Sequence, residues 1–116
     1  GLCYQIIEAG NADMIPADAD TVKVQYTGCL TDGKVFDSTE KNNNGEPVEF
    51  SLQRVIPGWR EGMELIGEGG KIKIWVPFNL GYGPRAMSAD LPAYSTLVFD
   101  VELVKVTRAI IEENKK

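Results

Sequence analysis

Histidine is absent from the 116-residue sequence, and its absence excludes several kinds of chemistry. Histidine is the commonest general base near neutral pH and a usual ligand of zinc. A Ser-His-Asp triad and a Cys-His pair therefore cannot form in this chain. Reactions that need neither a nucleophile nor a histidine base stay open.

Cysteine is scarce, since the chain has only Cys3 and Cys29. They form no C-x-x-C motif, so they build neither a zinc knuckle nor a thioredoxin-type redox pair. A Cys3–Cys29 disulfide stays open in an oxidising compartment, because the distance between the two thiols cannot be read from the sequence. The alternative is that both side chains are small apolar fillers.

The chain has fewer basic than acidic residues, and it has no long apolar run. Twelve Lys and Arg residues against seventeen Asp and Glu give a net charge of −5, which argues against a nucleic-acid-binding surface. No apolar stretch approaches the roughly 20 residues that cross a bilayer, so we expect no membrane contact by this domain. The chain begins with Gly1 rather than Met, which leaves open a missing leader or upstream segment.

The glycine-rich stretches predict turns rather than a nucleotide site. Gly67-Glu68-Gly69-Gly70 and Gly81-Tyr82-Gly83 match neither a P-loop nor a dinucleotide-binding fingerprint. The acidic pair Glu112-Glu113 has the pattern of solvated surface, and no EF-hand spacing occurs. We therefore expect neither a cofactor nor a metal site.

Alternation of apolar and polar residues predicts four or five β-strands. In residues 21–26, the side chains of Val22, Val24 and Tyr26 share one face of a half-buried strand. Asp32-Gly33 between two apolar pairs predicts a hairpin, because glycine accepts the positive φ of tight turns. The same alternation recurs in three further runs: Val48, Phe50 and Leu52; Ile72, Ile74 and Val76; and Leu97, Phe99, Val101 and Leu103.

One stretch has helical spacing instead. Trp59, Met63 and Ile66 recur at i, i+4 and i+7, as on the buried face of a helix. Pro57 suits the first turn of this helix, and Gly67 suits its end. Strands with a single short helix predict an α+β fold with an antiparallel sheet.

The chain is long enough for one domain and too short for two. We expect this domain to span residues 1–116, with its core in about 21–106. Residues 41–46 predict an exposed loop, and residues 107–116 a polar tail that is compatible with a helix.

Aromatic residues and one carboxylate together indicate a ligand pocket. The simpler interpretation is that each ring only fills the core. Asp37 favours the pocket, because a carboxylate on an apolar strand is costly unless it is hydrogen-bonded or used. Aromatic walls with a few polar groups are the general form of a ligand site. The rings concerned are Tyr26, Phe36, Phe50, Trp59, Tyr82 and Phe99.

Five short runs of residues are more specific together than any one of them alone. They are Val24-Gln25-Tyr26-Thr27-Gly28, Asp32-Gly33-Lys34-Val35-Phe36-Asp37-Ser38, Val55-Ile56-Pro57-Gly58-Trp59, Gly81-Tyr82-Gly83 and Thr96-Leu97-Val98-Phe99-Asp100-Val101-Glu102-Leu103. In this order they resemble the FKBP-type peptidyl-prolyl cis-trans isomerases, the macrolide-binding immunophilins. The resemblance implies a five- or six-stranded antiparallel sheet wrapped around one short helix.

The resemblance also implies a proline-binding pocket and assigns its residues. Trp59 would form the floor, and the Ile56 N–H and the Tyr82 hydroxyl would donate hydrogen bonds to a bound peptide or macrolide. Substrate contacts would come from the side chains of Val48, Phe50, Val55 and Leu91. The implied catalytic set is Tyr26, Phe36, Asp37, Ile56, Trp59, Tyr82 and Phe99.

The implied activity is cis-trans isomerisation of X-Pro bonds in unfolded or partly folded proteins, through binding of the twisted amide. The alternative is a non-catalytic chaperone module that binds proline-containing peptides in the same pocket. Proline-containing polypeptides are the implied substrates, and macrolides the implied inhibitors. A domain that lacks an initial Met and ends in the tail at residues 110–116 is similar to the catalytic part of bacterial envelope isomerases. This resemblance implies a periplasmic or envelope location, with the cytoplasm as alternative, and dimerisation through an upstream segment.

Overall fold

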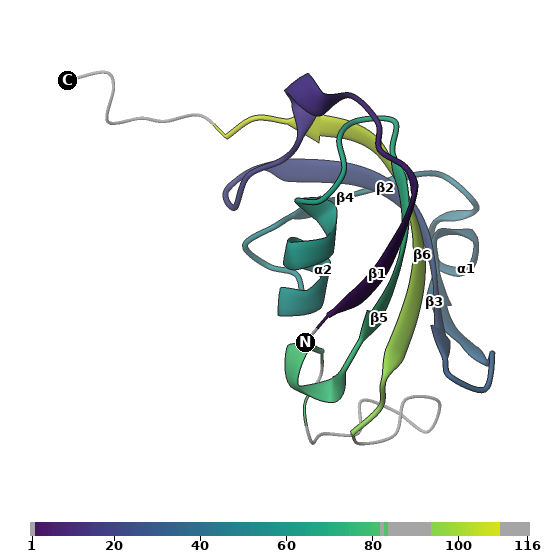
Figure 1. Ribbon diagram of the computed structural model, residues 1–116. Coiled ribbons are helices and arrows are strands. Elements are labelled where there is room, and N and C mark those ends of the chain that lie inside the picture. The colour runs from purple at the N-terminus through teal and green to yellow at the C-terminus, as the bar shows by residue number, and fades with distance from the viewer. Residues whose placement is uncertain (1, 82, 84–93, 110–116) are drawn as a thin grey trace.

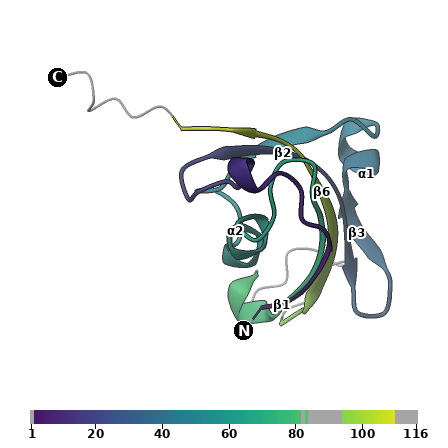
Figure 2. The same ribbon diagram turned by 45° about the horizontal axis from the view of Figure 1, so that its top comes forward.

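A six-stranded antiparallel sheet curves around one helix in the computed structural model, which describes residues 2–81, 83 and 94–109 (Figure 1). The strands are β1 (Cys3–Glu8), β2 (Thr21–Leu30), β3 (Val35–Ser38), β4 (Val48–Ser51), β5 (Lys71–Val76) and β6 (Leu97–Thr107). The helices are α1 (Thr39–Asn43) and α2 (Pro57–Met63), with short 3-10 turns η1 (Ala12–Met14) and η2 (Phe78–Leu80). Helix α2 lies on the concave side of the sheet, and α1 lies outside it beside β3 (Figure 2). The predicted α+β class is confirmed.

Within the described residues, no helix is both long and apolar enough to span a bilayer.

Strand β2 is the centre of the sheet. The strands follow the order β1-β5-β6-β2-β3, and β4 also pairs with β2. The first half of β2, from Thr21 to Val24, lies between β6 and β4, whereas its second half lies between β6 and β3. One strand therefore organises three neighbours.

The core fills the space between the concave face of the sheet and α2. Val24 on β2 is opposite Leu103 on β6, and Val76 on β5 is opposite Leu97, which confirms the predicted alternation. Burial of each such side chain contributes about 1.5–3 kcal/mol. The buried apolar residues are Val22, Val24, Tyr26, Leu52, Trp59, Met63, Ile66, Ile72, Ile74, Val76, Leu97, Phe99, Val101, Leu103 and Val106.

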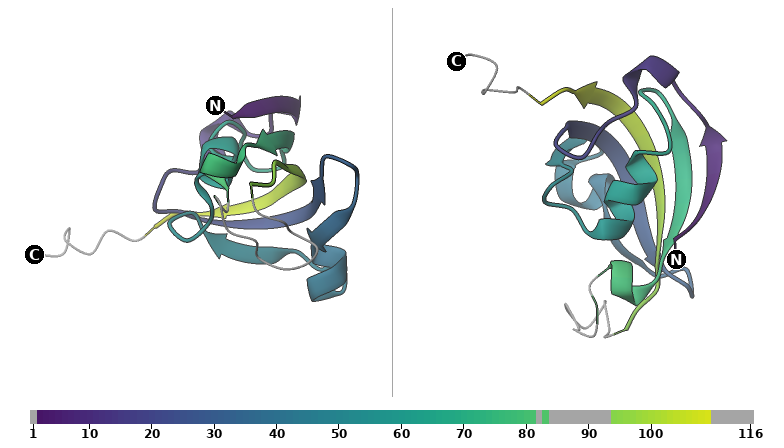
Figure 3. Two further views of the ribbon diagram at one scale, coloured as in Figure 1. Left: turned by 90° about the horizontal axis from the view of Figure 1, so that it is seen from below. Right: turned by 60° about the vertical axis from the view of Figure 1, so that its left-hand side comes forward.

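Helix α2 approaches the sheet closely because it carries glycine where it meets β5. A Cβ atom at Gly58 would lie 2.5 Å from Val76 Cγ1, and one at Gly62 would lie 3.1 Å from Ile74 Cγ2. Any larger residue at Gly58 would push the helix outward. Turn η2 lies beside the first turn of α2 (Figure 3), where the same Cβ at Gly58 would lie 3.2 Å from the carbonyl oxygen of Leu80.

Two predicted boundaries differ from the structure. Helix α2 ends at Met63 rather than running to Ile66, because the Leu65 N–H bonds the Gly62 carbonyl and tightens the chain into a turn. Residues 41–46, predicted as a loop, begin inside α1, where Ser38 caps the helix by accepting a hydrogen bond from the Lys41 N–H at 3.0 Å.

The two ends of the chain also differ from expectation. Strand β1 precedes the predicted 21–106 core and was not expected, since all six of its residues are exposed. The predicted polar tail begins with Thr107 still inside β6, and residues 108–109 form no helix. The remainder of that tail, from residue 110, lies outside the described residues.

The two cysteines cannot form a disulfide within this fold. Cys3 is opposite Trp75, Trp75 is opposite Val98, and Val98 is opposite Cys29, so the cysteines lie three strand spacings apart in one row. That separation is about 14 Å, whereas the Cα atoms of a disulfide lie within about 7 Å. Both thiols are free, and Cys3 is exposed, so it is no core filler either.

A buried carboxylate fastens the end of β6 to the loop before β2. Asp20, only 4% exposed, accepts hydrogen bonds from the Ala17 N–H, the Ala109 N–H and the Arg108 guanidinium at 2.8–2.9 Å. Burial by itself raises the pKa of Asp20, but these donors and the Arg108 charge outweigh it, so the pKa lies below its ordinary value. Arg108 also donates to the carbonyl oxygens of Ile15 and Asp13.

We expect Asp20→Ala to lower the free energy of unfolding by about 2–3 kcal/mol at pH 7, because three donors lose one buried acceptor. Urea denaturation measures the change. Asp13→Ala is the matched control, since Asp13 is exposed and accepts from Arg108 only through its backbone carbonyl. Equal losses in both variants would contradict this assignment.

A second carboxylate, at the end of α2, is stabilised in its protonated form. Burial raises the pKa of Glu64 to about 7, and the hydrogen bond and negative charge of Asp18 add to this, whereas Arg60 opposes it. The Oε2 atom of Glu64 is buried and has no hydrogen-bond partner among the described residues. Glu64 therefore favours a proton that it would lack in the unfolded chain near neutral pH.

We expect stability to fall as the pH rises from about 4.5 to about 7, because the folded protein holds a proton on Glu64 that the unfolded chain releases. Glu64→Gln removes this titration and should gain stability relative to the wild type between pH 6 and about 8. Thermal unfolding across that range measures the difference. Parallel stability profiles for the two proteins would show that Glu64 is not the group responsible.

Candidate functional site

An aromatic pocket of about 220 Å³ opens beside the first turn of α2. Side chains from β2, β3, β4, β6 and α2 converge on it, together with the segment between β4 and α2. Residues far apart in the sequence are therefore brought to one hollow. Its described lining is Tyr26, Asp37, Phe50, Arg54, Val55, Ile56, Trp59 and Phe99.

The indole of Trp59 forms the base of the pocket. It is 4% exposed, and three rings stand edge-on to it: Tyr26 at 5.1 Å, Phe99 at 5.3 Å and Phe50 at 5.6 Å between ring centroids. Each such edge-to-face contact contributes about 0.5–1.5 kcal/mol beyond the area it buries. Trp59 is thus held in one orientation from three sides.

One carboxylate of the pocket is held by a tyrosine. The hydroxyl of Tyr26 donates a hydrogen bond of 2.7 Å to Asp37 Oδ2, so the structure brings these two residues together. Asp37 lies on β3 directly opposite Gly28 of β2. Its carboxylate therefore stands at the edge of an apolar surface in a fixed orientation.

A backbone donor lies at the start of α2. Ile56 is the N-cap residue, with φ −61° and ψ 150°, and Pro57 occupies the first helical position. No described residue accepts a hydrogen bond from the Ile56 N–H. This N–H is accordingly available to a ligand in the pocket.

Phe36 and Val48 were predicted as pocket residues but do not line the hollow. The Phe36 ring packs edge-on against Phe99, with 5.7 Å between ring centroids. Gly28 leaves room for both rings, because a Cβ there would lie 2.8 Å from Phe99 and 2.9 Å from Phe36. Val48 is half-buried on β4 opposite Val24 and packs against the core.

Of the remaining site predictions, two concern residues outside the described part of the chain, and one pocket residue was not predicted. The predicted site residues Tyr82 and Leu91 lie outside the described residues. Arg54 lines the pocket and was missed, although it directly precedes the predicted wall residues Val55 and Ile56. No group of three His, Cys, Asp or Glu side chains that could hold a metal ion occurs in the described part of the chain.

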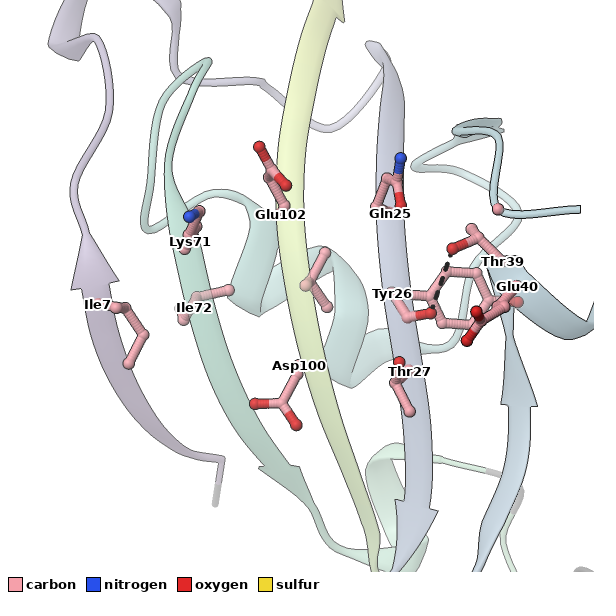
Figure 4. Close-up of a pocket in the computed structure, with 12 residues that line it drawn as sticks. Ile7, Gln25, Tyr26, Thr27, Thr39, Glu40, Lys71, Ile72, Asp100 and Glu102 are labelled. Carbon is pink, nitrogen blue, oxygen red and sulfur yellow. Dashed lines mark hydrogen bonds between the residues drawn. The ribbon is translucent and has the colours of Figure 1, made fainter. Parts of the chain in front are cut away.

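A larger hollow of about 500 Å³ lies on the opposite face of the sheet (Figure 4). Its labelled side chains come from β1, β5, β6 and β2 and from the start of α1, where the Thr39 hydroxyl donates to the Tyr26 carbonyl oxygen at 3.5 Å. Lys71, Gln25 and Glu102 lie along it, so its surface is polar and charged. The smaller hollow, with its packed rings and single carboxylate, is the better candidate site.

Comparison with known proteins agrees with this fold. Residues 12–104 match the model of the family described as FKBP-type peptidyl-prolyl cis-trans isomerase. A probable FKBP-type peptidyl-prolyl cis-trans isomerase of Haemophilus influenzae is 51% identical over 91% of this chain and 43% of that protein. FkpA of Escherichia coli K12, named as an isomerase of the same type, is 51% identical over 94% of this chain and 39% of that protein.

A further relative and a solved structure are also similar to this chain. The outer membrane protein MIP of Legionella longbeachae is 45% identical over 94% of this chain and 46% of that protein. The crystal structure of FkpA from Escherichia coli matches with a TM-score of 0.86 and 51% identity, covering 95% of this chain and 50% of that chain. The chain thus spans less than half the length of these curated relatives.

We expect Gly28→Ala to destabilise the protein by about 1–3 kcal/mol, because the added methyl group must displace the rings of Phe99 and Phe36. The loss is measurable by urea denaturation, and displaced rings should also change the near-ultraviolet circular dichroism. Thr27→Ala, at the neighbouring position on the opposite face of β2, is the control and should cost less than half as much. Equal costs at the two positions would mean that Gly28 is not required for ring packing.

Proposed function

Because the chain belongs to the family of FKBP-type peptidyl-prolyl cis-trans isomerases, we propose that its aromatic pocket accelerates rotation about X-Pro bonds in unfolded or partly folded proteins. The observation that carries this proposal is the buried Trp59 indole enclosed by three edge-on rings beside one oriented carboxylate. We further propose that residues 1–116 act as one domain.

The reaction to be accelerated requires no bond to break. Rotation about an X-Pro bond faces a barrier of about 18–20 kcal/mol, because the planar amide is stabilised by resonance. In the twisted transition state this resonance is lost, the carbonyl becomes less dipolar, and the nitrogen gains a lone pair. A catalyst therefore needs to bind the twisted amide more tightly than the planar one.

The pocket supplies an environment suited to the twisted form. A planar, dipolar amide is better solvated by water than the twisted amide is, so an apolar surface that excludes water favours the transition state. The rings of Trp59, Tyr26 and Phe99 provide this surface, and the side chains of Phe50 and Val55 extend it. A ten-thousandfold acceleration needs about 5–6 kcal/mol.

Hydrogen-bonding groups at the edge of the pocket orient the substrate. The Ile56 N–H would bind a substrate carbonyl, and Asp37, held by the Tyr26 hydroxyl, would interact with the region of the prolyl nitrogen and carbonyl. The hydrogen bond from the Ile56 N–H contributes about 0.5–1.5 kcal/mol. The Asp37 carboxylate would act through its charge, because neither the prolyl nitrogen nor the carbonyl has a hydrogen to donate to it. Since no proton transfer is needed, the absence of histidine does not limit the reaction.

The remaining predicted residues keep supporting roles in this proposal. Phe36 would hold the Phe99 ring through their edge-on contact, and Val48 would support the pocket through its packing against the core. Tyr82 would donate its hydroxyl to the substrate, and Leu91 would contact the substrate at the rim.

Substrates and location follow from the family and its members. Proline-containing polypeptides are the substrates that this family acts on, and macrolides are proposed as inhibitors of the same pocket. We propose a bacterial periplasmic or envelope location, which is supported by bacterial relatives, one of them named an outer membrane protein. Dimerisation through a segment upstream of this chain is likewise proposed.

A protease-free assay on a peptide with a Leu-Pro bond tests the activity. We expect the wild type to accelerate isomerisation, and Trp59→Leu to lower kcat/KM at least about tenfold, equivalent to about 1.4 kcal/mol of transition-state binding. Met63→Leu is the matched control: Met63 is fully buried one turn further along α2 but does not line the pocket. It should leave kcat/KM within about twofold of the wild type.

Folding of both variants is verified by far-ultraviolet circular dichroism. A wild-type protein that binds the peptide without accelerating its isomerisation would support the non-catalytic binding module instead. Unchanged turnover in folded Trp59→Leu would show that this pocket is not the site of the reaction.

A further inference from the structure

Arg54 is the one cationic side chain among the described residues that line the aromatic pocket. It is exposed and lies in the segment that leads from β4 to α2, next to the wall residues Val55 and Ile56. Its backbone N–H bonds the Ser51 carbonyl, which fixes the local turn. Arg54 is therefore held by its backbone at the border of the pocket that its side chain lines.

Arg54 differs from the other two arginines of the described residues, whose guanidinium groups have partners within the protein. Arg60 donates to the Leu52 carbonyl oxygen at 3.1 Å, and Arg108 forms a salt bridge with Asp20. For Arg54, the described part of the chain offers no carboxylate within 4.0 Å and no side-chain hydrogen bond. Its charge and its five donors are therefore available to a ligand.

The other charged group of the pocket is not a partner of Arg54. Asp37 accepts a hydrogen bond from Tyr26, and it forms no ion pair with Arg54 in this structure. Among the described residues, the site thus presents an apolar base with the Asp37 carboxylate and, apart from it, the unpaired Arg54 guanidinium. Elsewhere the protein carries an excess of acidic residues, with a net charge of −5, which disfavours acidic peptides in general.

We propose that Arg54 determines substrate specificity by favouring peptides with a carboxylate directly beside the proline. This inference rests on the proposed isomerase function. The proline ring occupies the apolar base over Trp59, so its flanking residues reach the rim, where Arg54 lies. Guanidinium and carboxylate groups match in geometry and form paired hydrogen bonds.

The expected preference is modest, because the interaction is exposed to solvent. Exposed ion pairs correspond to about two- to fivefold in binding. The preference should decrease with added salt, since screening weakens exposed pairs. It should appear mainly in KM, because the flanking carboxylate is bound equally in the planar and the twisted amide.

Matched peptides test this inference at both flanking positions. Glu and Gln are compared before proline in Ala-Xaa-Pro-Phe, and after proline in Ala-Leu-Pro-Xaa, as acceleration over the uncatalysed rate at low ionic strength. We expect the wild type to favour Glu over Gln by about two- to fivefold in kcat/KM in at least one series. Arg54→Gln should bring this ratio to about one, Arg54→Glu should invert it, and Arg54→Lys should retain part of it.

The neutral peptide Ala-Leu-Pro-Phe and a control variant separate the possible outcomes. Lys105→Gln removes an exposed cation on β6, which does not line the pocket, and should leave the Glu-to-Gln ratio unchanged. If the wild type fails to accelerate Ala-Leu-Pro-Phe, the proposed function itself is wrong. If it accelerates that peptide but shows a Glu-to-Gln ratio near one in both series, or if Arg54→Gln leaves the ratio intact, the role of Arg54 is overturned and the isomerase function stands.

Discussion

The contact between the Trp59 indole and three aromatic rings is the interaction on which the site depends. Tyr26 comes from β2, Phe50 from β4 and Phe99 from β6, so the indole joins three strands to one helix. This contact is only reached because Gly58 lets α2 lie against Val76. The same contacts therefore pack the core and shape the pocket, so substitutions that move α2 change both.

Polar groups add orientation to this apolar surface. The Tyr26 hydroxyl holds Asp37, and the N-cap geometry at Ile56 leaves a backbone N–H without an acceptor among the described residues. A site of this kind can favour a twisted amide by excluding water and placing a few donors and acceptors. It has no need of a nucleophile or a proton relay, which agrees with a chain that lacks histidine.

The sequence predicted those strands in which buried and exposed residues alternate along the chain. Strands β2, β5 and β6 alternate between core and surface, so their pattern is strong. Among the described strands, β1 pairs only with β5, and because all its residues are exposed it shows no alternation of burial that could reveal it in the sequence. Likewise, the distance between Cys3 and Cys29 depends on strand order, and the position of Arg54 at the pocket depends on the turn after β4.

The central position of β2 has a consequence for how the chain acquires its structure. Val22 pairs with Val106, close to the end of the described chain, while β4 and β3 flank β2 on its other side. Strand pairs between segments so distant in sequence form late in folding, because bringing the segments together costs much chain entropy. During synthesis, β2 therefore gains its β6 partner, and the Trp59 indole its contact with Phe99, only after β6 has emerged from the ribosome.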